Sequence, residues 1–380
     1  MVDEFSLKMV TKEKSPLPLL KNIYSNLLKK DNKAIVLFGA GFMGTSYLKF
    51  LREITSNKIF FCDNNPRKWG TFIEGVPVIS LHDLKTKHHN SLIIITSIAY
   101  YDAILLQLKE SNLHNNLPHN LSNKLAKDIL ASDIFNYKNY KNYFNIVQKH
   151  FSKFKETYSI LSDNCSKEIF CQRINYCITL NSKYLIPLRS TSAQYFESPI
   201  ISFLKDEIFI DGGAYTGDTV EEFLKHTKGN FKKIYSFEPE ESKHKEFLEN
   251  FSDITNITLI SYGLWNKKDV LRFNARNDGS SGVNKDGNIE IPVTSIDEYL
   301  NGKPVTFIKM DIEGAELEAL KGAENTIKTY KPKLAICIYH NPLDIVEIPL
   351  YLKSIVPEYK FYLRHYGNGI SETVCYAVTT

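Results

Sequence analysis

Short apolar runs in the C-terminal half of the chain end repeatedly at an acidic residue. The runs and their acids are Ile208–Ile210 before Asp211, Ile234–Phe237 before Glu238, and Val305–Met310 before Asp311. The first and third runs lead into helical patterns, and this alternation of strand and helix predicts an α/β fold with a parallel sheet. Because the carboxyl ends of parallel strands meet at one edge of a sheet, the three acids are expected to converge on one crevice.

The first of these strand ends continues into a glycine-rich turn. Asp211 is followed by Gly212, Gly213 and Gly217, which predicts a strand, a tight turn and a helix, with backbone that a ligand can approach closely. An aspartate at this position would repel a pyrophosphate, so a cationic ligand fits better. S-adenosylmethionine carries a sulfonium and an ammonium group and no phosphate, and we expect it as the cofactor.

The residues expected to hold this cofactor follow from the strand ends and the turn. They are Asp211, Gly212, Gly213, Tyr215, Thr216, Glu238 and Asp311. Glu238, which comes 27 residues after Asp211, is placed to hold ribose hydroxyls. Taken one at a time, each acid could also be a helix N-cap, since Asp and Glu are favoured there.

A second glycine turn lies near the N-terminus. The β-run 34–38 leads into Gly39, Gly41 and Gly44 in a GxGxxG pattern, and Asp63 closes the next strand, 58–62. This context predicts a Rossmann-like domain that binds a nucleotide or a nucleotide sugar. The alternative is that the glycines only permit close packing of strand and helix.

The pattern along the chain divides it into three parts. We predict an N-terminal Rossmann-like domain over residues 1–122, which begins with an amphipathic helix at 17–30. Residues 123–200 are predicted to form a helical connector rich in aromatic residues such as Tyr137 and Tyr140, and residues 201–380 are predicted to form the catalytic domain. The last domain closes with β-runs at 359–366 and 373–378 around Gly367-Asn368-Gly369, which predicts an antiparallel hairpin. The fold class is therefore α/β, with two Rossmann-like domains joined by a helical connector.

Composition narrows the class of protein without deciding its chemistry. The 380 residues are 43% hydrophobic and 24% charged, with a net charge of +4, which is typical of a globular protein. Basic residues are scattered among acids, so we expect no nucleic-acid partner.

No apolar run reaches the length of a membrane span and no signal-peptide core is present, so a cytoplasmic location is expected. Six cysteines without a CxxC pair indicate reduced thiols.

Four ordered sequence blocks resemble the FkbM-type branch of the class I S-adenosylmethionine-dependent methyltransferases. The blocks are Ile208–Thr219, Phe237–Pro239, Thr294–Tyr299, and Ile308–Glu316 with Leu320–Ala323. The resemblance implies a class I sheet with a terminal antiparallel hairpin, and methyl transfer to an oxygen, commonly a hydroxyl of a sugar or a natural product. We therefore expect a sugar or glycan-related acceptor and a role in surface polysaccharide biosynthesis.

The N-terminal domain carries a second resemblance. Phe61–Pro66 followed by Gly75–Ile79 is similar to the nucleotide-sugar-binding domain that precedes some bacterial sugar-modifying transferases. The resemblance implies a nucleotide sugar as a ligand of this domain, held near Gly39, Gly41, Gly44 and Asp63.

The residues that could perform the chemistry follow the third acidic strand and its neighbour. Asp311 and Glu313 share a face of an extended strand end, and His340 follows the strand 334–339. Methyl transfer to a hydroxyl needs a proton acceptor, and Glu313 or His340 is the preferred base. The same three side chains could instead collect a divalent metal, although no spacing motif requires one. Arg364 and His365 could meet an anionic acceptor, or they could simply be solvated residues at a strand end.

Two other functions fit parts of the sequence. One is an NAD-dependent oxidoreductase that uses the turn Gly39–Gly44, for which Tyr100 and Tyr101 are the candidate proton donors. The other is a nonenzymatic scaffold in which both glycine turns hold nucleotides without turnover.

Overall fold

The structure is a computed structural model that describes residues 4–9, 22, 25, 33–97, 100–117, 143–179, 182–274, 282–283, 289–367 and 370–379. The helix expected at 17–30 falls almost wholly outside these residues, as do Tyr137, Tyr140 and the hairpin residues Asn368 and Gly369. The chain divides into two compact units. The N-terminal unit comprises Lys12–Lys141 with Ile178–Ser182, and the C-terminal unit comprises Met1–Thr11, Asn142–Cys177 and Lys183–Thr380.

The N-terminal unit is built on a five-stranded sheet with the order β3-β4-β2-β1-β5. Its elements are β1 (Ile35–Phe38), α3 (Phe42–Arg52), β2 (Ile59–Cys62), η1 (Pro66–Lys68), β3 (Phe72–Ile73), β4 (Val76–Ile79), α4 (Leu81–Lys87), β5 (Leu92–Ile95) and α5 (Tyr101–Glu110). The strands pair in parallel except β3, which runs antiparallel to β4. This arrangement agrees with the Rossmann-like pattern of the sequence.

The central strand β1 shows why this sheet needs helices on both faces. All four of its residues are buried. Ile35 and Leu37 belong to one apolar cluster, and Val36 and Phe38 belong to another. Successive side chains of a strand point to opposite faces, so a continuous apolar run is buried only where both faces are covered.

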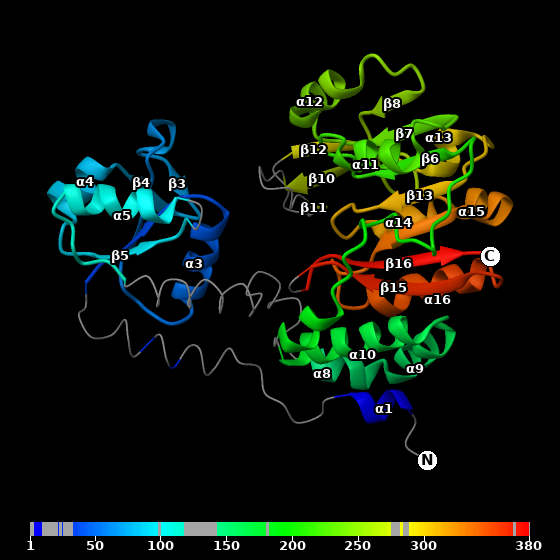
Figure 1. Ribbon diagram of the computed structural model, residues 1–380, viewed down its shortest axis with the longest axis horizontal. Helices are drawn as coiled ribbons and strands as arrows, with labels where there is room; N and C mark the ends of the chain where they lie inside the picture. Colours follow the sequence, from blue (N-terminus) through cyan, green and yellow to red (C-terminus); the bar gives the residue numbers. More distant parts are fainter. Residues whose placement is uncertain are drawn as a thin grey trace. The chain divides into compact units, whose positions relative to one another are not determined.

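The C-terminal unit contains a seven-stranded sheet with the order β15-β16-β14-β13-β6-β7-β8 (Figure 1). Its strands are β6 (Ile208–Gly212), β7 (Lys233–Phe237), β8 (Ile257–Ile260), β13 (Phe307–Met310), β14 (Lys333–Cys337), β15 (Lys360–His365) and β16 (Thr373–Val378). Only β16 runs antiparallel to its neighbours, β14 and β15. The predicted terminal antiparallel hairpin of a methyltransferase sheet is therefore confirmed.

Helices cover this sheet and connect its strands. They are α11 (Asp218–Thr227), α12 (Glu241–Phe251), α13 (Ile296–Leu300), α14 (Glu316–Lys321), α15 (Glu324–Tyr330) and α16 (Asp344–Ile355). The polar face of α11 and its buried Val220 and Phe223 show the usual amphipathic division of a surface helix.

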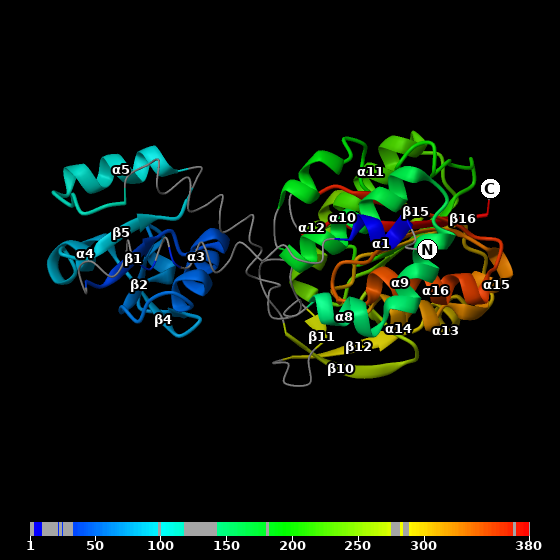
Figure 2. The ribbon, with the colours of Figure 1, turned by 90° about the horizontal axis from the view of Figure 1, so that it is seen from below.

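Helices from the expected connector also belong to the C-terminal unit. From the connector these are α8 (Tyr143–Lys149), α9 (Phe151–Ile160) and α10 (Asn164–Thr179) as far as Cys177, and the short segments η2 (Ser182–Tyr184) and η3 (Ile186–Leu188) follow in the chain. Helix α1 (Glu4–Lys8), which precedes the N-terminal unit, belongs to the C-terminal unit as well. Helix α9 packs against α16, and Lys153 pairs with Glu347 at 2.9 Å (Figure 2). The Tyr143 hydroxyl donates to the carbonyl of Pro342 at 3.0 Å. The described helices up to Cys177 are thus part of the unit that contains the seven-stranded sheet.

A second, four-stranded sheet follows β8, and the sequence pattern did not reveal it. Its strands, in the order β11-β10-β12-β9, are β9 (Gly263–Leu264), β10 (Asp269–Asn274), β11 (Gly282–Val283) and β12 (Ile289–Thr294). Among the described side chains of this sheet, Ile291 and Val293 form a buried cluster, with Trp265 and Leu271 packed against them. Strands this short, with one exposed side and Pro292 within β12, give a weak periodic signal.

The strand order of the large sheet reverses between β6 and β13. Strand β6 pairs in parallel with β7 on one side and with β13 on the other. The register places Asp211 opposite Ser236 and opposite Lys309. Open α/β sheets bind ligands beyond the carboxyl ends of the strands at such a reversal, so the fold brings the predicted acids to the expected edge.

None of the helices in the described part of the chain has both the length and the apolar composition needed to cross a membrane. All six cysteines are unpaired, and each is buried except Cys165.

The approach of β6 to β13 depends on a glycine. Gly213 has a φ of +76°, and a Cβ at this position would lie 2.0 Å from the carbonyl oxygen of Asp311. Gly229 has nearly the same φ, +73°, but open space around it. We expect Gly229→Ala to cost only the backbone strain of about 1 kcal/mol, and Gly213→Ala to cost about 2–4 kcal/mol because the clash adds to that strain.

Tryptophan fluorescence can measure this difference in the C-terminal unit alone. The chain has two tryptophans, Trp69 in the N-terminal unit and Trp265 in the C-terminal unit. In a Trp69→Phe background, urea unfolding followed at Trp265 should rank wild type, Gly229→Ala and Gly213→Ala in falling stability. Equal losses for the two glycine variants would contradict the packing role of Gly213.

Candidate active site

A cavity of about 530 Å³ lies at the carboxyl edge of the seven-stranded sheet, where the strand order reverses. Residues that follow β6, β7 and β13 line it, and Gly263, Leu264, Ile291 and Val293 of the second sheet add an apolar wall. Its acidic lining residues are Asp218, Glu238, Glu240, Asp311, Glu313 and Glu372, and its one cationic lining residue is Lys309. The described lining therefore carries a clear excess of negative charge.

Asp211 lies behind this cavity and does not line it. Its carboxylate is fully buried and pairs with the ammonium of Lys309, with 2.9 Å between Oδ1 and Nζ. Lys309 also donates to the carbonyl oxygens of Gly212 at 3.3 Å and Gly213 at 3.0 Å. Asp211 and Lys309 thus fasten β6 to β13 and hold the turn that follows β6.

Both members of this pair are charged at neutral pH. Burial raises the pKa of Asp211 to about 6, against the opposing effect of Lys309. Burial alone would lower the pKa of Lys309, but Asp211 and Asp311 outweigh it and raise that pKa. An isolated charge at this depth would be very unfavourable, so each member requires the other.

The other residues of the turn that were predicted to bind the cofactor differ in whether they line the cavity. Gly213 and Tyr215 line the cavity, whereas Gly212 and Thr216 do not. A Cβ on Gly212 would lie 2.9 Å from Leu264, so Gly212 permits packing of the second sheet. The exposed ring of Tyr215 lies 4.4 Å from the ammonium of Lys243.

Glu238 lies at the end of β7 and lines the cavity. Its Oε2 accepts from the backbone N–H of Tyr215 at 2.8 Å, and its Oε1 accepts from the N–H of Glu240 at 2.8 Å. Burial raises the pKa of Glu238. Because each carboxylate oxygen can accept two hydrogen bonds, each retains a lone pair for a ligand. In this orientation the carboxylate of Glu238 can accept hydrogen bonds from two adjacent hydroxyl groups.

Asp311 lies at the end of β13 and is held by two tyrosines. The Tyr195 hydroxyl donates to its Oδ2 at 2.8 Å, and the Tyr339 hydroxyl donates to its Oδ1 at 3.1 Å. Burial alone would raise the pKa of Asp311, but His340 and Lys309 outweigh it and lower that pKa. Asp311 is therefore an oriented, ionised carboxylate at the cavity wall.

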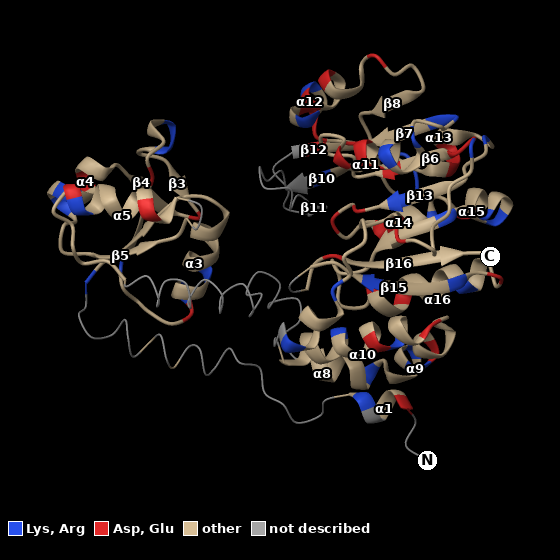
Figure 3. Cartoon of the chain, viewed as in Figure 1, with Lys and Arg blue, Asp and Glu red and all other residues tan. Residues whose placement is uncertain are grey.

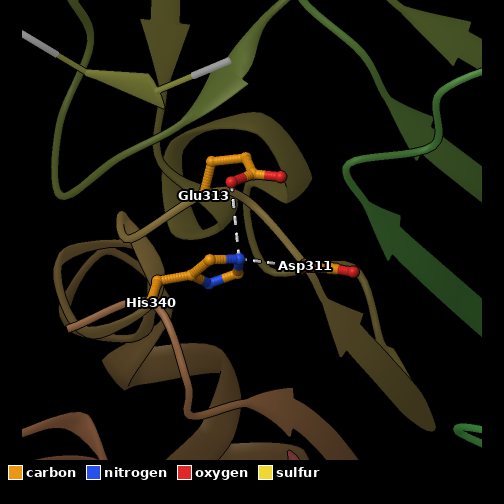
Figure 4. A group of neighbouring side chains, drawn as sticks. All are labelled: Asp311, Glu313 and His340. Atoms are coloured by element: carbon orange, nitrogen blue, oxygen red, sulfur yellow. Dashed lines mark ion pairs between the residues drawn. The ribbon is translucent and has the colours of Figure 1, made fainter. Parts of the chain in front are cut away.

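Figure 4 shows His340 between Asp311 and Glu313, as the sequence predicted for this edge of the sheet. Its Nε2 lies 3.4 Å from Oδ1 of Asp311 and 3.5 Å from Oε2 of Glu313. Its Nδ1 lies 2.9 Å from Oε1 of Glu316. Burial alone would lower the pKa of His340, but Glu316, Asp311 and Glu313 outweigh it and raise that pKa to about 10.

This geometry changes the expected role of His340. Both ring nitrogens face carboxylates, the side chain is 9% exposed, and His340 does not line the cavity. Asp311 and Glu313 do line it. Of the two candidate bases, Glu313 is therefore the one that lies at the cavity.

Several site residues carried no recognisable signal in the sequence. Glu316 is fully buried and accepts from the backbone N–H of Ile312 at 2.8 Å. Gln194, Tyr195 and Glu372 reach the cavity from segments far from the glycine turn. Lys309 is an interior strand residue in the sequence, and only its pairing opposite Asp211 reveals its role.

The expectation for Arg364 and His365 was wrong. Arg364 pairs with Asp163 at 2.8 Å and lies 3.7 Å from Glu197. His365 is fully buried with Nδ1 2.9 Å from the Thr373 hydroxyl, and burial lowers its pKa to about 3. Both side chains stabilise the edge of the sheet, and neither is placed to meet an anionic acceptor.

The N-terminal unit has a cavity of its own, of about 830 Å³, around the turn that follows β1. Gly39, Gly41 and Asp63 line it together with Lys68 and Tyr100. Asp63 accepts from the N–H of Ala40 at 2.8 Å and pairs with Lys68 at 3.0 Å.

The glycines of that turn have different environments. Gly44 does not line the cavity, and a Cβ there would lie 2.1 Å from the carbonyl oxygen of Gly39. A Cβ on Gly41 would meet no atom within 4 Å. Gly44 therefore serves the packing of α3 on β1, whereas Gly41 leaves open space beside the cavity.

Comparison with known proteins identifies the family of residues 211–367, within the C-terminal unit. Residues 211–367 match the family model described as the methyltransferase FkbM domain. Methyltransferase FkbM from Methylobacillus flagellatus KT has a similar structure, with a TM-score of 0.59 and 22% identity over 95% of this chain and 99% of that chain. The resemblance found in the sequence is confirmed, and the chain carries a methyltransferase domain of the FkbM type.

Two further solved structures are similar over about half of the chain. An rRNA methylase from Streptococcus thermophilus has a TM-score of 0.31 and 20% identity over 46% of this chain and 86% of that chain. Fibrillarin from Aeropyrum pernix, in complex with natively bound S-adenosyl-L-methionine, has a TM-score of 0.32 and 12% identity over 48% of this chain and 69% of that chain. A search of curated protein sequences gave no match.

The buried pair behind the cavity gives a test of how the site is held. Lys309→Met leaves the carboxylate of Asp211 buried without its partner, and we expect it to lower the free energy of unfolding of the C-terminal unit by about 3–5 kcal/mol. The double variant Asp211→Asn with Lys309→Met removes both charges and should recover most of that loss. Urea unfolding followed at Trp265 measures both values. A double variant no more stable than Lys309→Met would refute the pairing as the source of the effect.

Proposed function

We propose that the chain, whose residues 211–367 form a methyltransferase domain of the FkbM type, transfers a methyl group from S-adenosylmethionine to a hydroxyl of a sugar or glycan-related acceptor. One observation supports S-adenosylmethionine as the cofactor. The cavity at the switch point of the sheet is lined by six carboxylates and one lysine, and a ligand with a sulfonium and an ammonium group suits that charge.

Electrostatics disfavour a phosphate-bearing cofactor in this cavity. A pyrophosphate would lie among Asp218, Glu238 and Glu240, and like charges at such distances repel strongly where water is excluded. Glu238 supports the cofactor assignment further, because its backbone hydrogen bonds leave lone pairs for two ribose hydroxyls. Gly213 and Tyr215 give the cavity its backbone wall on the β6 side. Thr216 and Gly212 contribute through the shape of the turn.

The acceptor end of the cavity is rich in hydrogen-bonding groups. Asp311, Glu313 and Glu372 offer carboxylate oxygens, and Gln194 and Tyr195 add an amide and a hydroxyl. A polyol such as a sugar can donate to several of these groups at once. The family resemblance supports the carbohydrate class and a role in polysaccharide biosynthesis.

The proposed reaction is an in-line displacement. The acceptor oxygen attacks the methyl carbon, the bond from sulfur to that carbon breaks, and the products are a methyl ether, S-adenosylhomocysteine and a proton. Positioning supplies much of the rate enhancement in such a transfer. Glu313 takes the proton, because it is a candidate base that lies at the cavity, whereas both nitrogens of His340 face carboxylates.

The assignment of Glu238 can be tested with a matched pair of charge removals. Glu238→Gln should weaken S-adenosylmethionine binding about tenfold or more, because a hydrogen bond to a charged group contributes roughly 1.5–3 kcal/mol. Glu241→Gln removes the same charge at an exposed position of α12 and should leave the affinity unchanged. Isothermal titration calorimetry measures both. Equal affinities for the two variants would exclude Glu238 from the cofactor site.

A second binding function is favoured by the cavity of the N-terminal unit. We propose that this unit binds a nucleotide or a nucleotide sugar near Gly39, Gly41, Gly44 and Asp63. The side chain of Lys68 is 37% exposed beside the turn, and its ammonium, which bonds Asp63 and the carbonyl of Ala40, can also meet a phosphate oxygen. The exposed rings of Phe42 and Tyr100 also line the cavity and suit stacking on a base.

Gly41 allows the N-terminal cavity to be blocked without disturbing its packing. Because a Cβ at Gly41 meets no atom within 4 Å, Gly41→Val should fold and should abolish binding of a uridine diphosphate sugar, while S-adenosylmethionine affinity stays at the wild-type value. Trp69 fluorescence in a Trp265→Phe background checks that the N-terminal unit is folded. Titration with NAD tests the oxidoreductase alternative, and NAD binding without nucleotide-sugar binding would overturn the proposed ligand.

A further inference from the structure

We infer that Asp311, Glu313 and His340 bind a divalent metal ion, and that this ion holds the acceptor through two adjacent oxygen atoms. The inference deepens the proposed function and rests on it for the identity of the reaction. Metal binding itself rests only on the three side chains and on the groups that orient them.

The three side chains are close enough to share one ion. One ligand atom from each, two carboxylate oxygens and an imidazole nitrogen, lie within 4.8 Å of one another. Ions of this class bind oxygen and nitrogen at about 2.0–2.2 Å, so neighbouring ligands of an octahedral site lie about 3 Å apart. The separations of 3.4 Å and 3.5 Å from Nε2 to the two carboxylates need only a small contraction.

His340 provides the independent observation that points to a ligand. Its side chain is 9% exposed, and neither ring nitrogen makes a hydrogen bond, although each lies within 3.5 Å of a carboxylate oxygen. Figure 4 shows Nε2 directed toward Asp311 and Glu313. Buried polar atoms are almost always hydrogen-bonded, so a buried nitrogen aimed between two carboxylates at 3.4 Å and 3.5 Å fits the position of an ion.

The neighbours of these side chains are those that a metal site requires. Metal-binding histidines usually direct the second ring nitrogen to a carboxylate or a carbonyl, which fixes the ring and its tautomer. Here Nδ1 of His340 lies 2.9 Å from the fully buried Glu316, whose Oε1 also accepts from the N–H of Ile312. Tyr195 and Tyr339 donate to Asp311. Asp311 and His340 thus each have neighbours that fix their orientation.

The local charge also favours a divalent cation. Asp311, Glu313, Glu316 and Glu372 gather at this end of the cavity, and Lys309 is already paired with Asp211. Figure 3 shows the acidic residues between β13 and α14 in red. Several carboxylates at one partly buried site repel one another unless a cation lies among them.

The donor set indicates the class of ion and of acceptor. Two carboxylates and one imidazole suit Mn²⁺ and its neighbours in the first transition row, because carboxylate favours Mg²⁺ and Mn²⁺ and imidazole favours the later metals. Three protein ligands leave three positions of an octahedron. Asp311 and Glu313 border the cavity, so a vicinal diol of a sugar can fill two of those positions.

The ion would act on the hydroxyl that is methylated. An ion held by Asp311, Glu313 and His340 would lower the pKa of a hydroxyl bound to it. Glu313, whose second oxygen points away from His340 in Figure 4, would accept the proton, and the acceptor oxygen would attack the methyl carbon as the bond from carbon to sulfur breaks. No oxidant or further reactant is needed.

Binding of Mn²⁺ to the full chain tests the inference without an activity assay. After treatment with a chelator, the wild-type protein should bind one Mn²⁺, measured as loss of the free-ion signal in electron paramagnetic resonance. Glu313→Gln, at a side chain 32% exposed, should fold and should lose this binding. Glu316→Gln keeps all three ligands, disturbs the carboxylate that faces Nδ1 of His340, and should weaken binding about 10- to 100-fold. Glu240→Gln removes a carboxylate of the same cavity outside the proposed site and should bind Mn²⁺ as wild type does.

Calorimetry with S-adenosylmethionine on the same samples separates the two proposals. Cofactor binding without Mn²⁺ binding would overturn the metal site and leave the methyltransferase proposal standing, with His340 as a buried cation among carboxylates. Mn²⁺ binding without cofactor binding would support the metal site and overturn the proposed cofactor. Equal weakening by Glu240→Gln and Glu313→Gln would show that the ion binds the acidic cavity in general, which would also overturn the assignment. Vicinal and isolated hydroxyl acceptors then test the diol, since only vicinal acceptors should gain from Mn²⁺.

Discussion

The candidate site depends on one buried ion pair, between Asp211 of β6 and Lys309 of β13. Neither charge can be placed in this interior alone, because the cost of removing an ion from water is several kcal/mol even after relaxation. Each charge therefore fixes the strand that carries it. Lys309 also donates to the carbonyl oxygens of Gly212 and Gly213, so the same ammonium that neutralises Asp211 sets the path of the chain into the turn. The position of the cavity wall follows from this pairing.

The pair also decides which acids can meet a ligand. Asp211 faces the interior, and its charge is cancelled by Lys309 within the sheet. Glu238 and Asp311 lie at strand ends of the same sheet, yet both reach the cavity. The negative character of the cavity thus arises from residues beyond the strands, and the ion pair serves as its support. The balanced charge inside the sheet and the unbalanced charge outside it are separate features with separate functions.

The sequence was sufficient to predict the features that repeat with a regular period or that end in a turn. The parallel strands, the hairpin 360–378 and the meeting of Asp311, Glu313 and His340 at one edge follow from apolar runs and the order of an α/β sheet. Whether an acid at a strand end faces the cavity or the core depends on register, which is why Asp211 was expected to hold the cofactor directly. Glu316 and Tyr195 reach the site through tertiary packing, which leaves no local pattern. Strands β9 and β11 have two residues each, too few to show a period, and Pro292 within β12 weakens the strand signal there.

Backbone geometry gives a further reason to regard this cavity as the functional site. Nine non-glycine residues in the described part of the chain have a positive φ. Lys228, Asn301 and Lys331 are helix C-caps, where this conformation is common. Four others, Tyr195, Tyr215, Glu313 and Glu372, line the cavity.

A left-handed conformation costs a non-glycine residue about 1–2 kcal/mol, and glycine would remove that cost. The four cavity residues are nevertheless not glycines, and their side chains each carry a phenol or a carboxylate. Such strain persists only where the surrounding structure imposes it, and it concentrates at functional sites. At Glu313 the conformation, with a φ of 56°, accompanies a carboxylate that turns from the end of β13 toward His340 (Figure 4). A glycine at position 313 would adopt this conformation without strain but would lack the carboxylate. The strained backbone is therefore the cost of placing that carboxylate at the cavity.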